Sequence, residues 1–216
     1  MKYSTELFEK LNDEKKDRVI QAAIKEFSEK GFENANTNKI AKLANISVGS
    51  LFKYFRSKND LFLYIVEIAT SELEKQVGRI LDQDKAFFDT VEDMLILICE
   101  YSKNNKALIR LYHEMTSIGQ ASLATKVVTS FENLAGSHYQ NMVKEAQEKG
   151  GLRDDLDPAV VAFTLDNIFV SLQFSYALPY YMERKKLFLG KEIKDKDLIN
   201  ESMLFIKKAL ASKEKD

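Results

Sequence analysis

One short segment of the sequence gathers side chains that can bind nucleic acid. Between Thr37 and Asn59 there are five basic residues and no acidic residue, a charge of +5, so the remainder sums to −6 in a chain of net charge −1. Basic groups attract phosphate, and neighbouring hydroxyl and amide groups can hydrogen-bond to phosphates and base edges. This segment is therefore a candidate polyanion-binding surface, and an ordinary solvated helix face is the alternative.

The spacing of apolar residues predicts that the segment folds as a helix-turn-helix. Two short helices are expected over residues 37–44 and 47–55, with a tight turn at Asn45-Ile46 between them. Asparagine suits such a turn because it tolerates a positive φ better than most residues. Three side chains of the second helix share the side that would face the core: Val48, Leu51 and Phe55. The opposite side would be free to enter a major groove.

The exposed side of this second helix carries residues that we expect to contact DNA. Gly49 permits close approach of the backbone, and Lys53 can reach phosphate or guanine. Ser50 and Tyr54 flank the exposed side and can hydrogen-bond to bases or phosphates. Each of these residues alone is common on a solvated face, but their convergence in one acid-free segment favours DNA binding.

Helix ends in the same region offer further contacts with anions. Thr37 and Ser47 are expected as N-cap residues, and helix N-termini favour phosphate. The stretch Ser57–Asp60 has the form of a capping box that opens a long helix. Lys58, at the start of that helix, could clamp the DNA backbone.

Helical periodicity continues through nearly the whole chain, which has only eight glycines and two prolines. Besides the two short helices, we expect helices over residues 13–30, 57–81, 85–103, 106–117, 122–149, 158–176 and 196–211. Gly31 should end the first of them, and Pro179 should end or kink the helix before it. The predicted fold is all-α with about nine helices. A helix-turn-helix domain over residues 1–57 precedes a larger helical bundle over 58–216, without a flexible linker.

The segment from Thr37 to Leu61 resembles the DNA-binding motif of the TetR (tetracycline-repressor-like, TetR/AcrR) family of bacterial transcription regulators. The family pattern reads roughly T-x-x-x-I-A-x-x-A-G-V-S-x-G-x-L-Y-x-Y-F-x-x-K-x-x-L. It is matched here by Thr37, Ile40-Ala41, Ala44, Ser47, Gly49, Leu51, Tyr54-Phe55, Lys58 and Leu61. The family's lead-in, A-x-x-x-F-x-x-x-G-[YF], is matched by Ala23, Phe27, Gly31 and Phe32. The resemblance covers about the first 65 residues.

The resemblance implies that the second helix of the motif recognises operator DNA. By position, it implies DNA contacts for Thr37, Val48, Gly49, Phe52, Lys53, Tyr54 and Lys58. This sequence departs from the family pattern at two places. Asn45 replaces a usual glycine, which its tolerance of positive φ explains. Phe52 replaces a usual tyrosine, so a hydroxyl expected to bind phosphate is missing.

The resemblance also implies a repressor that binds a near-palindromic operator as a homodimer and is released by a small effector. The dimer would form through the last two helices, and a charge at Phe169 or Phe205 should split or unfold it. The helix over 158–176 is apolar around most of its circumference, which fits a dimer helix or, alternatively, a central core helix. An apolar or amphipathic effector is expected, with these candidate contacts: Tyr101, Tyr112, His113, Met115, Phe131, His138, Asn167 and Gln173. Each could instead be an ordinary core or surface residue.

Other classes of function have little support in the sequence. There are only two histidines, and no metal-binding, nucleophile or phosphate-loop motif occurs, so no enzyme, cofactor or metal site is expected. The single cysteine, Cys99, and the lack of an apolar leader or membrane-length run predict a cytoplasmic protein that meets no membrane. The competing hypothesis is a DNA-binding regulator or architectural protein without an effector, in which basic charge would cover the whole surface.

Overall fold

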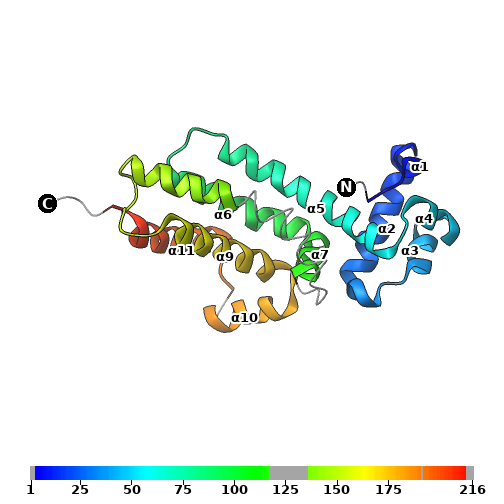
Figure 1. Ribbon diagram of the computed structural model, residues 1–216. Coiled ribbons are helices and arrows are strands. Elements are labelled where there is room, and N and C mark those ends of the chain that lie inside the picture. The colour runs from blue at the N-terminus through cyan, green and yellow to red at the C-terminus, as the bar shows by residue number, and fades with distance from the viewer. Residues whose placement is uncertain (1–2, 117–135, 191, 213–216) are drawn as a thin grey trace. The chain divides into compact units, whose positions relative to one another are not determined.

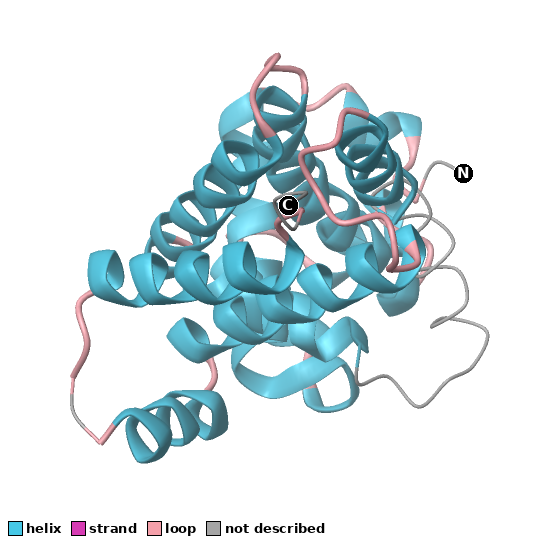
Figure 2. Cartoon of the chain, turned by 90° about the vertical axis from the view of Figure 1, so that its left-hand side faces the viewer, coloured by secondary structure: helices cyan, strands magenta, loops and turns pink. Residues whose placement is uncertain are grey.

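The computed structural model of the protein describes residues 3–116, 136–190 and 192–212 (Figure 1). Over these ranges the chain consists of helices joined by loops, as Figure 2 shows, so the all-α prediction is confirmed. The chain divides into two compact units, Met1–Leu73 with Ala107–Ala124 and Glu74–Lys106 with Thr125–Asp216. The predicted domain boundary at residue 57 stays a prediction.

The first unit contains the two short helices of the predicted motif. Its helices are α1 (Glu6–Glu9), α2 (Asp13–Asn34), α3 (Thr37–Leu43), α4 (Val48–Tyr54), the first part of α5 (Lys58–Leu81) and most of α7 (Lys106–Thr116). Asn12 begins α2, because its side-chain oxygen accepts the Lys15 N–H at 2.9 Å. The bounds of α3, α4 and α5 lie within one residue of the predicted ones.

Gly31 interrupts α2, as the sequence predicted. Its φ of 71° and ψ of 169° lie outside the helical region. A Cβ atom on this residue would lie 2.6 Å from Oε2 of Glu114 in α7. The backbone conformation therefore favours glycine at this position, whereas the Glu114 side chain could move away from a Cβ atom.

Phenylalanine rings form the core of the first unit. Phe27 and Phe62 are fully buried, and their ring centres lie 5.1 Å apart. Phe32 also packs against Phe62, with ring centres 4.9 Å apart. Burial of each such ring contributes about 1.5–3 kcal/mol. These contacts hold α2 against α5.

The second unit is a helical bundle around one apolar core. It contains α6 (Phe87–Asn104), a helical segment over residues 136–148, α9 (Pro158–Ala177), α10 (Pro179–Leu189) and α11 (Asp195–Leu210). α6 packs against α9 and α11, and α10 packs against α9 (Figure 1). Side chains at the centre of this core include Val91, Leu95, Ile98, Val143, Leu165, Phe169, Met203 and Ile206.

Two helices were not expected from the sequence. α1 is only four residues long, and α10 begins at Pro179, which was expected to end or kink a helix. The described residues form ten labelled helices and the segment over 136–148, so the expectation of about nine helices is too low. Pro158 lies in the first turn of α9 as predicted, and Asp157 caps that helix by accepting the Ala159 N–H at 2.7 Å.

α9 has a buried and an exposed apolar side. Phe169 is 4% exposed and packs against Tyr139 at a centroid distance of 6.0 Å, so it belongs to the core of the bundle, and a charge there is expected to unfold the bundle. Phe163 of the same helix is 70% exposed. By length and composition α9 could also cross a membrane, contrary to the expectation that no such run exists. That is weak evidence for a membrane helix, because packing against α6 accounts for its buried apolar side.

A polar cluster joins four helices of the second unit. The Tyr176 hydroxyl of α9 donates to Asp195 Oδ1 at 2.8 Å and also lies 3.2 Å from Cys99 Sγ of α6. Lys103 of α6 forms an ion pair with Asp195 of α11, and Lys185 of α10 lies 3.9 Å from the centre of the Tyr176 ring. Burial by itself raises the pKa of Asp195, but Lys103 and the Tyr176 hydroxyl outweigh it and lower the pKa below its usual value.

Asp195→Asn should lower the free energy of unfolding by about 1–3 kcal/mol near neutral pH, because Tyr176 and Lys103 lose a charged partner. A carboxyl whose pKa is lowered by folding stabilises the fold above its unfolded pKa of about 3.9, and this contribution is lost as the pH falls through the lower folded value. Urea unfolding at neutral pH and at about pH 3 measures both effects.

The control for this prediction is Asp197→Asn, which removes the same charge from an exposed position in the first turn of α11. Asp197→Asn should lower the free energy of unfolding by no more than about 0.3–1 kcal/mol, the contribution of a favourable charge at a helix N-terminus. Equal losses in both variants, or a loss for Asp195→Asn that does not shrink in acid, would contradict the role of the cluster.

Candidate nucleic-acid interface

α3 and α4 both begin at a side-chain cap. Asn36 Oδ1 accepts the Asn38 N–H at 2.9 Å, which makes Asn36 the N-cap of α3. The expectation that Thr37 is the N-cap is wrong, because Asn36 has the extended backbone of a cap and Thr37 is already helical. Ser47 caps α4 as predicted, since its Oγ accepts the Ser50 N–H at 3.0 Å.

A buried carboxylate fixes the start of α3. Glu26 of α2 is 2% exposed, accepts the Asn36 N–H at 3.3 Å and pairs with Lys39 Nζ at 2.7 Å. Burial by itself raises the pKa of Glu26, but Lys39 and the Asn36 N–H outweigh it and hold the pKa below its usual value. Glu26 is therefore charged at neutral pH. Lys39, one of the five basic residues of the motif, is neutralised by it, which the sequence did not predict.

The turn between α3 and α4 has the expected backbone. Asn45 has a φ of 55° and is the one non-glycine residue with positive φ among the described residues. Its N–H donates to the Lys42 carbonyl at 3.1 Å, and the Ile46 N–H donates to the Ala41 carbonyl at 3.0 Å. The last carbonyls of α3 are thus satisfied by the turn itself, which fixes the direction in which α4 leaves it.

α4 has a buried side and an exposed side, as the helical wheel predicted. Leu51 and Phe55 are buried, whereas Gly49, Phe52 and Lys53 are exposed, Phe52 by 43%. The Lys53 ammonium has no hydrogen-bond or ion-pair partner in the described part of the chain. A Cβ atom on Gly49 would meet a single atom, at 3.9 Å, so the space above this glycine is open. Val48 lies half-exposed between the two sides.

Tyr54 lies differently from the prediction. It is 8% exposed, and its ring centre lies 5.6 Å from that of Phe8 in α1. The expectation that Tyr54 flanks the exposed side of α4 is wrong, because α1 covers that edge of the helix. A hydrogen bond from its hydroxyl to DNA stays a prediction.

The start of α5 also lies at this interface. Ser57 Oγ accepts the Asp60 N–H at 3.0 Å, which confirms the predicted cap. Lys58 Nζ donates to the Glu33 carbonyl at 3.0 Å and lies 5.0 Å from the centre of the Phe32 ring. The Lys58 ammonium is thus held at the end of α2, and its contact with a DNA phosphate stays a prediction.

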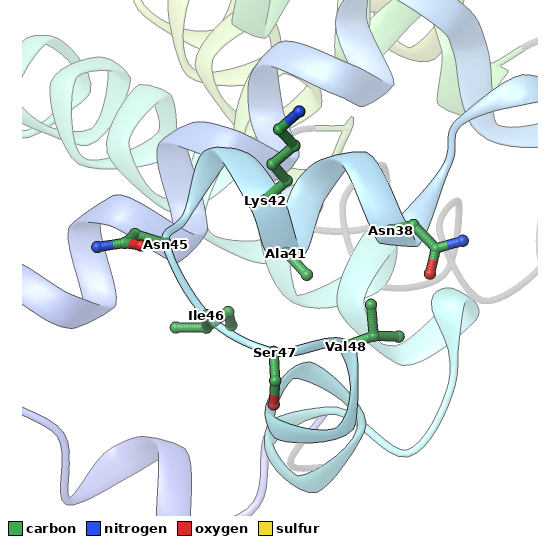
Figure 3. A pocket seen from close by; sticks show the side chains of 7 residues that line it. All are labelled: Asn38, Ala41, Lys42, Asn45, Ile46, Ser47 and Val48. Carbon is green, nitrogen blue, oxygen red and sulfur yellow. The ribbon is translucent and has the colours of Figure 1, made fainter.

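An open groove of about 580 Å³ lies between α3 and the start of α4 (Figure 3). It is lined by Asn38, Ala41, Lys42, Asn45, Ile46, Ser47 and Val48. In Figure 3, Ala41 points toward the turn and Lys42 extends from the opposite side of α3. Lys42, Lys53 and Arg56 are exposed basic side chains without an ion-pair partner among the described residues. These three cations, and not all five basic residues, supply the free positive charge of the motif.

The predicted effector contacts are divided between the two units. Two lie half-exposed on α7 of the first unit, Tyr112 and His113. Four lie in the second unit, the first two buried and the others exposed: Tyr101, Gln173, His138 and Asn167. The side chain of Met115 and all of Phe131 lie outside the described residues. Their grouping around an effector stays a prediction.

Residues 19–65 match the family model described as bacterial regulatory proteins, tetR family. The DNA-binding part of the chain is therefore of the TetR type. The match spans the helix-turn-helix and the capped start of α5, so the resemblance seen in the sequence is confirmed. The protein is thus a helix-turn-helix transcription regulator that binds DNA.

Individual proteins support the same family. The chain is 23% identical to the uncharacterized HTH-type transcriptional regulator YhgD of Bacillus subtilis over 163 residues, 76% of this chain and 84% of the relative. A TetR family transcriptional regulator from Chloroflexus aurantiacus shares its fold with a TM-score of 0.70 at 19% identity, over 97% of this chain and 99% of that one. The structure of AibR in complex with isovaleryl coenzyme A and operator DNA has a TM-score of 0.67 at 15% identity, over 88% and 96% of the chains.

Lys53→Ala should weaken binding to a duplex that the wild-type protein selects from random DNA. Loss of one good base contact costs about 1–3 kcal/mol. The free energy of unfolding should not change, because the side chain is exposed. Fluorescence anisotropy at a stated salt concentration measures the affinity. Lys144→Ala, which removes an exposed lysine from the second unit, should leave the affinity for the duplex unchanged. Equal affinities of both variants for the selected duplex would remove α4 from the recognition role.

Proposed function

We propose that this regulator is a TetR-family repressor that binds a near-palindromic operator as a homodimer and is released by a small effector. The observation that carries the operator-binding part is the geometry of α4. This helix presents Gly49, Phe52 and Lys53 on one exposed side, between caps and a turn that fix its direction. A short rigid helix with one free cationic side suits insertion into a major groove.

The exposed residues of α4 have distinct proposed roles. Gly49 lets the helix backbone approach the base edges, and Lys53 bonds to guanine or to phosphate. Phe52 has no hydroxyl for phosphate, so its exposed ring is proposed to contact apolar groove surface, such as a thymine methyl group. Lys42 and Arg56 lie outside α4 and supply phosphate contacts that do not depend on sequence.

Selection of bound sequences from random DNA tests this function directly. The proposal expects a pair of related half-sites whose centres are about 34 Å apart, one turn of the double helix. It also expects the selected duplex to bind about 10³-fold or more tightly than random DNA at the same salt concentration. An architectural protein would select no common sequence and would bind both duplexes alike.

The proposed homodimer rests on exposed apolar side chains of α9 and α11. Four of them lie on these two helices: Val160, Phe163, Leu204 and Phe205. Large exposed apolar side chains that recur on neighbouring elements mark an interaction surface. A second copy of the chain would cover them, and a symmetric pair of recognition helices is what a palindromic operator needs. Phe205 is 68% exposed and fits this surface, and Phe163 is its counterpart on α9 because Phe169 is buried.

Phe205→Glu and Phe163→Glu should each convert the protein to a monomer, because an interface cannot bury an unpaired carboxylate without a large cost. Both side chains point out of their own core, so circular dichroism should show unchanged helix content. Sedimentation equilibrium at micromolar concentration measures the assembly. Gln140→Glu adds the same charge at an exposed position of the segment over 136–148 and should stay dimeric. A wild-type protein that sediments as a monomer would refute the dimer.

The proposed effector is apolar or amphipathic and binds in the second unit. The aromatic-rich bundle supports this class of ligand, and AibR, which shares the fold, is known in complex with isovaleryl coenzyme A and operator DNA. The helix that can transmit binding is α5, which is separated from α4 by three residues and continues into the second unit. A ligand that moves α5 changes the position of α4 and lowers operator affinity. A cytoplasmic location follows from this function.

Isovaleryl coenzyme A, a long-chain acyl-coenzyme A and the free fatty acid are the probes for the effector, and coenzyme A alone is the control. We expect one of the three acyl compounds to lower operator affinity about 5- to 150-fold, the usual range of allosteric coupling. By linkage, the same compound must bind the operator complex more weakly by the same factor. If operator affinity is the same with all three as with coenzyme A alone, the effector proposal for these compounds fails and only the DNA-binding function stands.

A further inference from the structure

The segment Ser4–Glu9 lies against the C-terminal end of the recognition helix α4. The Thr5 N–H donates to the Tyr54 carbonyl at 2.9 Å, and Thr5 Oγ1 donates to the Lys53 carbonyl at 2.9 Å. The last carbonyls of any helix have no partner within the helix. Thr5 therefore satisfies two such carbonyls of α4, from a part of the chain far away in sequence.

An aromatic contact accompanies these hydrogen bonds. Phe8 is fully buried, and its ring centre lies 5.6 Å from that of Tyr54 and 4.7 Å from that of Phe55. It also lies 5.4 Å from Tyr64 of α5, edge to face. The Ser4 hydroxyl donates to the Glu9 carboxylate, which ties the two ends of the segment together. One buried ring thus joins α1 to the end of α4 and to α5.

We propose that Ser4–Glu9 is a brace for the recognition helix, and that Thr5 and Phe8 are positioning residues for operator recognition. α4 has seven residues, and isolated helices of that length are unstable in water. Its N-terminal end is held by the Asn45 turn and the Ser47 cap, and its outer side faces solvent. The brace holds the other end, so the direction of the exposed side chains depends on it.

The chemistry of the segment fits positioning and not direct contact with DNA. Both hydrogen-bond donors of Thr5 are used by α4, and Phe8 is buried. Glu6 and Glu9 give α1 acidic side chains in its first turn, which phosphate would repel. Loss of the brace should therefore reduce the preference for the operator while leaving the attraction to any DNA intact.

Thr5→Val tests the hydrogen bond of the side chain at nearly constant shape, and Thr5→Ser is the conservative variant that keeps the hydroxyl. For Thr5→Val we expect operator affinity to fall about two- to tenfold, as the loss of one hydrogen bond predicts. Affinity for random DNA should stay the same. In the free protein, amide hydrogen exchange over residues 48–55 should become faster. Thr5→Ser should restore both values.

Phe8→Leu tests the ring contact, with Leu7→Ala on the exposed side of the same helix as its control. Phe8→Leu should reduce the ratio of operator to random-DNA affinity more than Leu7→Ala does. If Thr5→Val and Phe8→Leu lower the melting temperature but leave that ratio and the exchange of α4 unchanged, the segment is only structural and the proposal is overturned. The exchange measurement needs no DNA, so it tests the brace even if the wild-type protein selects no operator.

Discussion

The buried carboxylate of Glu26 is the interaction on which the geometry of the DNA-binding motif depends. It holds the backbone N–H that precedes α3 and the Lys39 ammonium one turn into α3. A buried charge is stable only when it is paired and hydrogen-bonded, so the Glu26 carboxylate requires both of these partners. α3 can therefore begin at only one place relative to α2. The turn and α4 follow α3 directly along the chain, so their direction depends on that starting point.

The same carboxylate decides which lysines can act on DNA. A count of charges treats the five basic residues of the motif alike. In the structure, Lys39 is ion-paired with Glu26 and Lys58 donates to the Glu33 carbonyl. The free cations are Lys42 and Lys53, with Arg56 just beyond α4. One short segment thus contains both basic residues that hold the fold and basic residues that are free to bind DNA. The position of Glu26 on α2 determines that Lys39 belongs to the first group.

Features of the motif that depend on local chemistry could be predicted from the sequence. Asn45 allows a positive φ, Ser47 and Ser57 are good caps, and Gly31 cannot continue a helix. Contacts between distant segments could not be predicted. The burial of Tyr54 depends on Phe8, from a helix of four residues whose own periodicity is too short to detect. The ion pair of Glu26 with Lys39 also joins two separate helices and could not be predicted for the same reason.

The apolar side chains of α9 show a second limit of sequence reasoning. A helix that is apolar around most of its circumference has to be covered on several sides, but composition does not say which side its own chain covers. Phe163 and Phe169 are equally good interface residues by type, yet one is exposed and the other lies in the core. Their different exposure follows from the packing of the bundle, in which α6 lies against α9 and Tyr139 of the segment over 136–148 contacts Phe169.

The two ends of α4 are held in physically different ways, and this bears on how a signal could reach it. Its start is fixed by polar contacts that belong to α2, α3 and the turn. Its end is joined to α5 by rings, because Phe55 lies 5.3 Å from Tyr64 and Phe8 touches both. Close-packed rings transmit displacement instead of absorbing it, since the interior has few voids to take up motion. In the proposed release mechanism, a shift of α5 tilts α4 about its polar start, and such a tilt moves the exposed side chains most at Lys53, near the end that the rings hold.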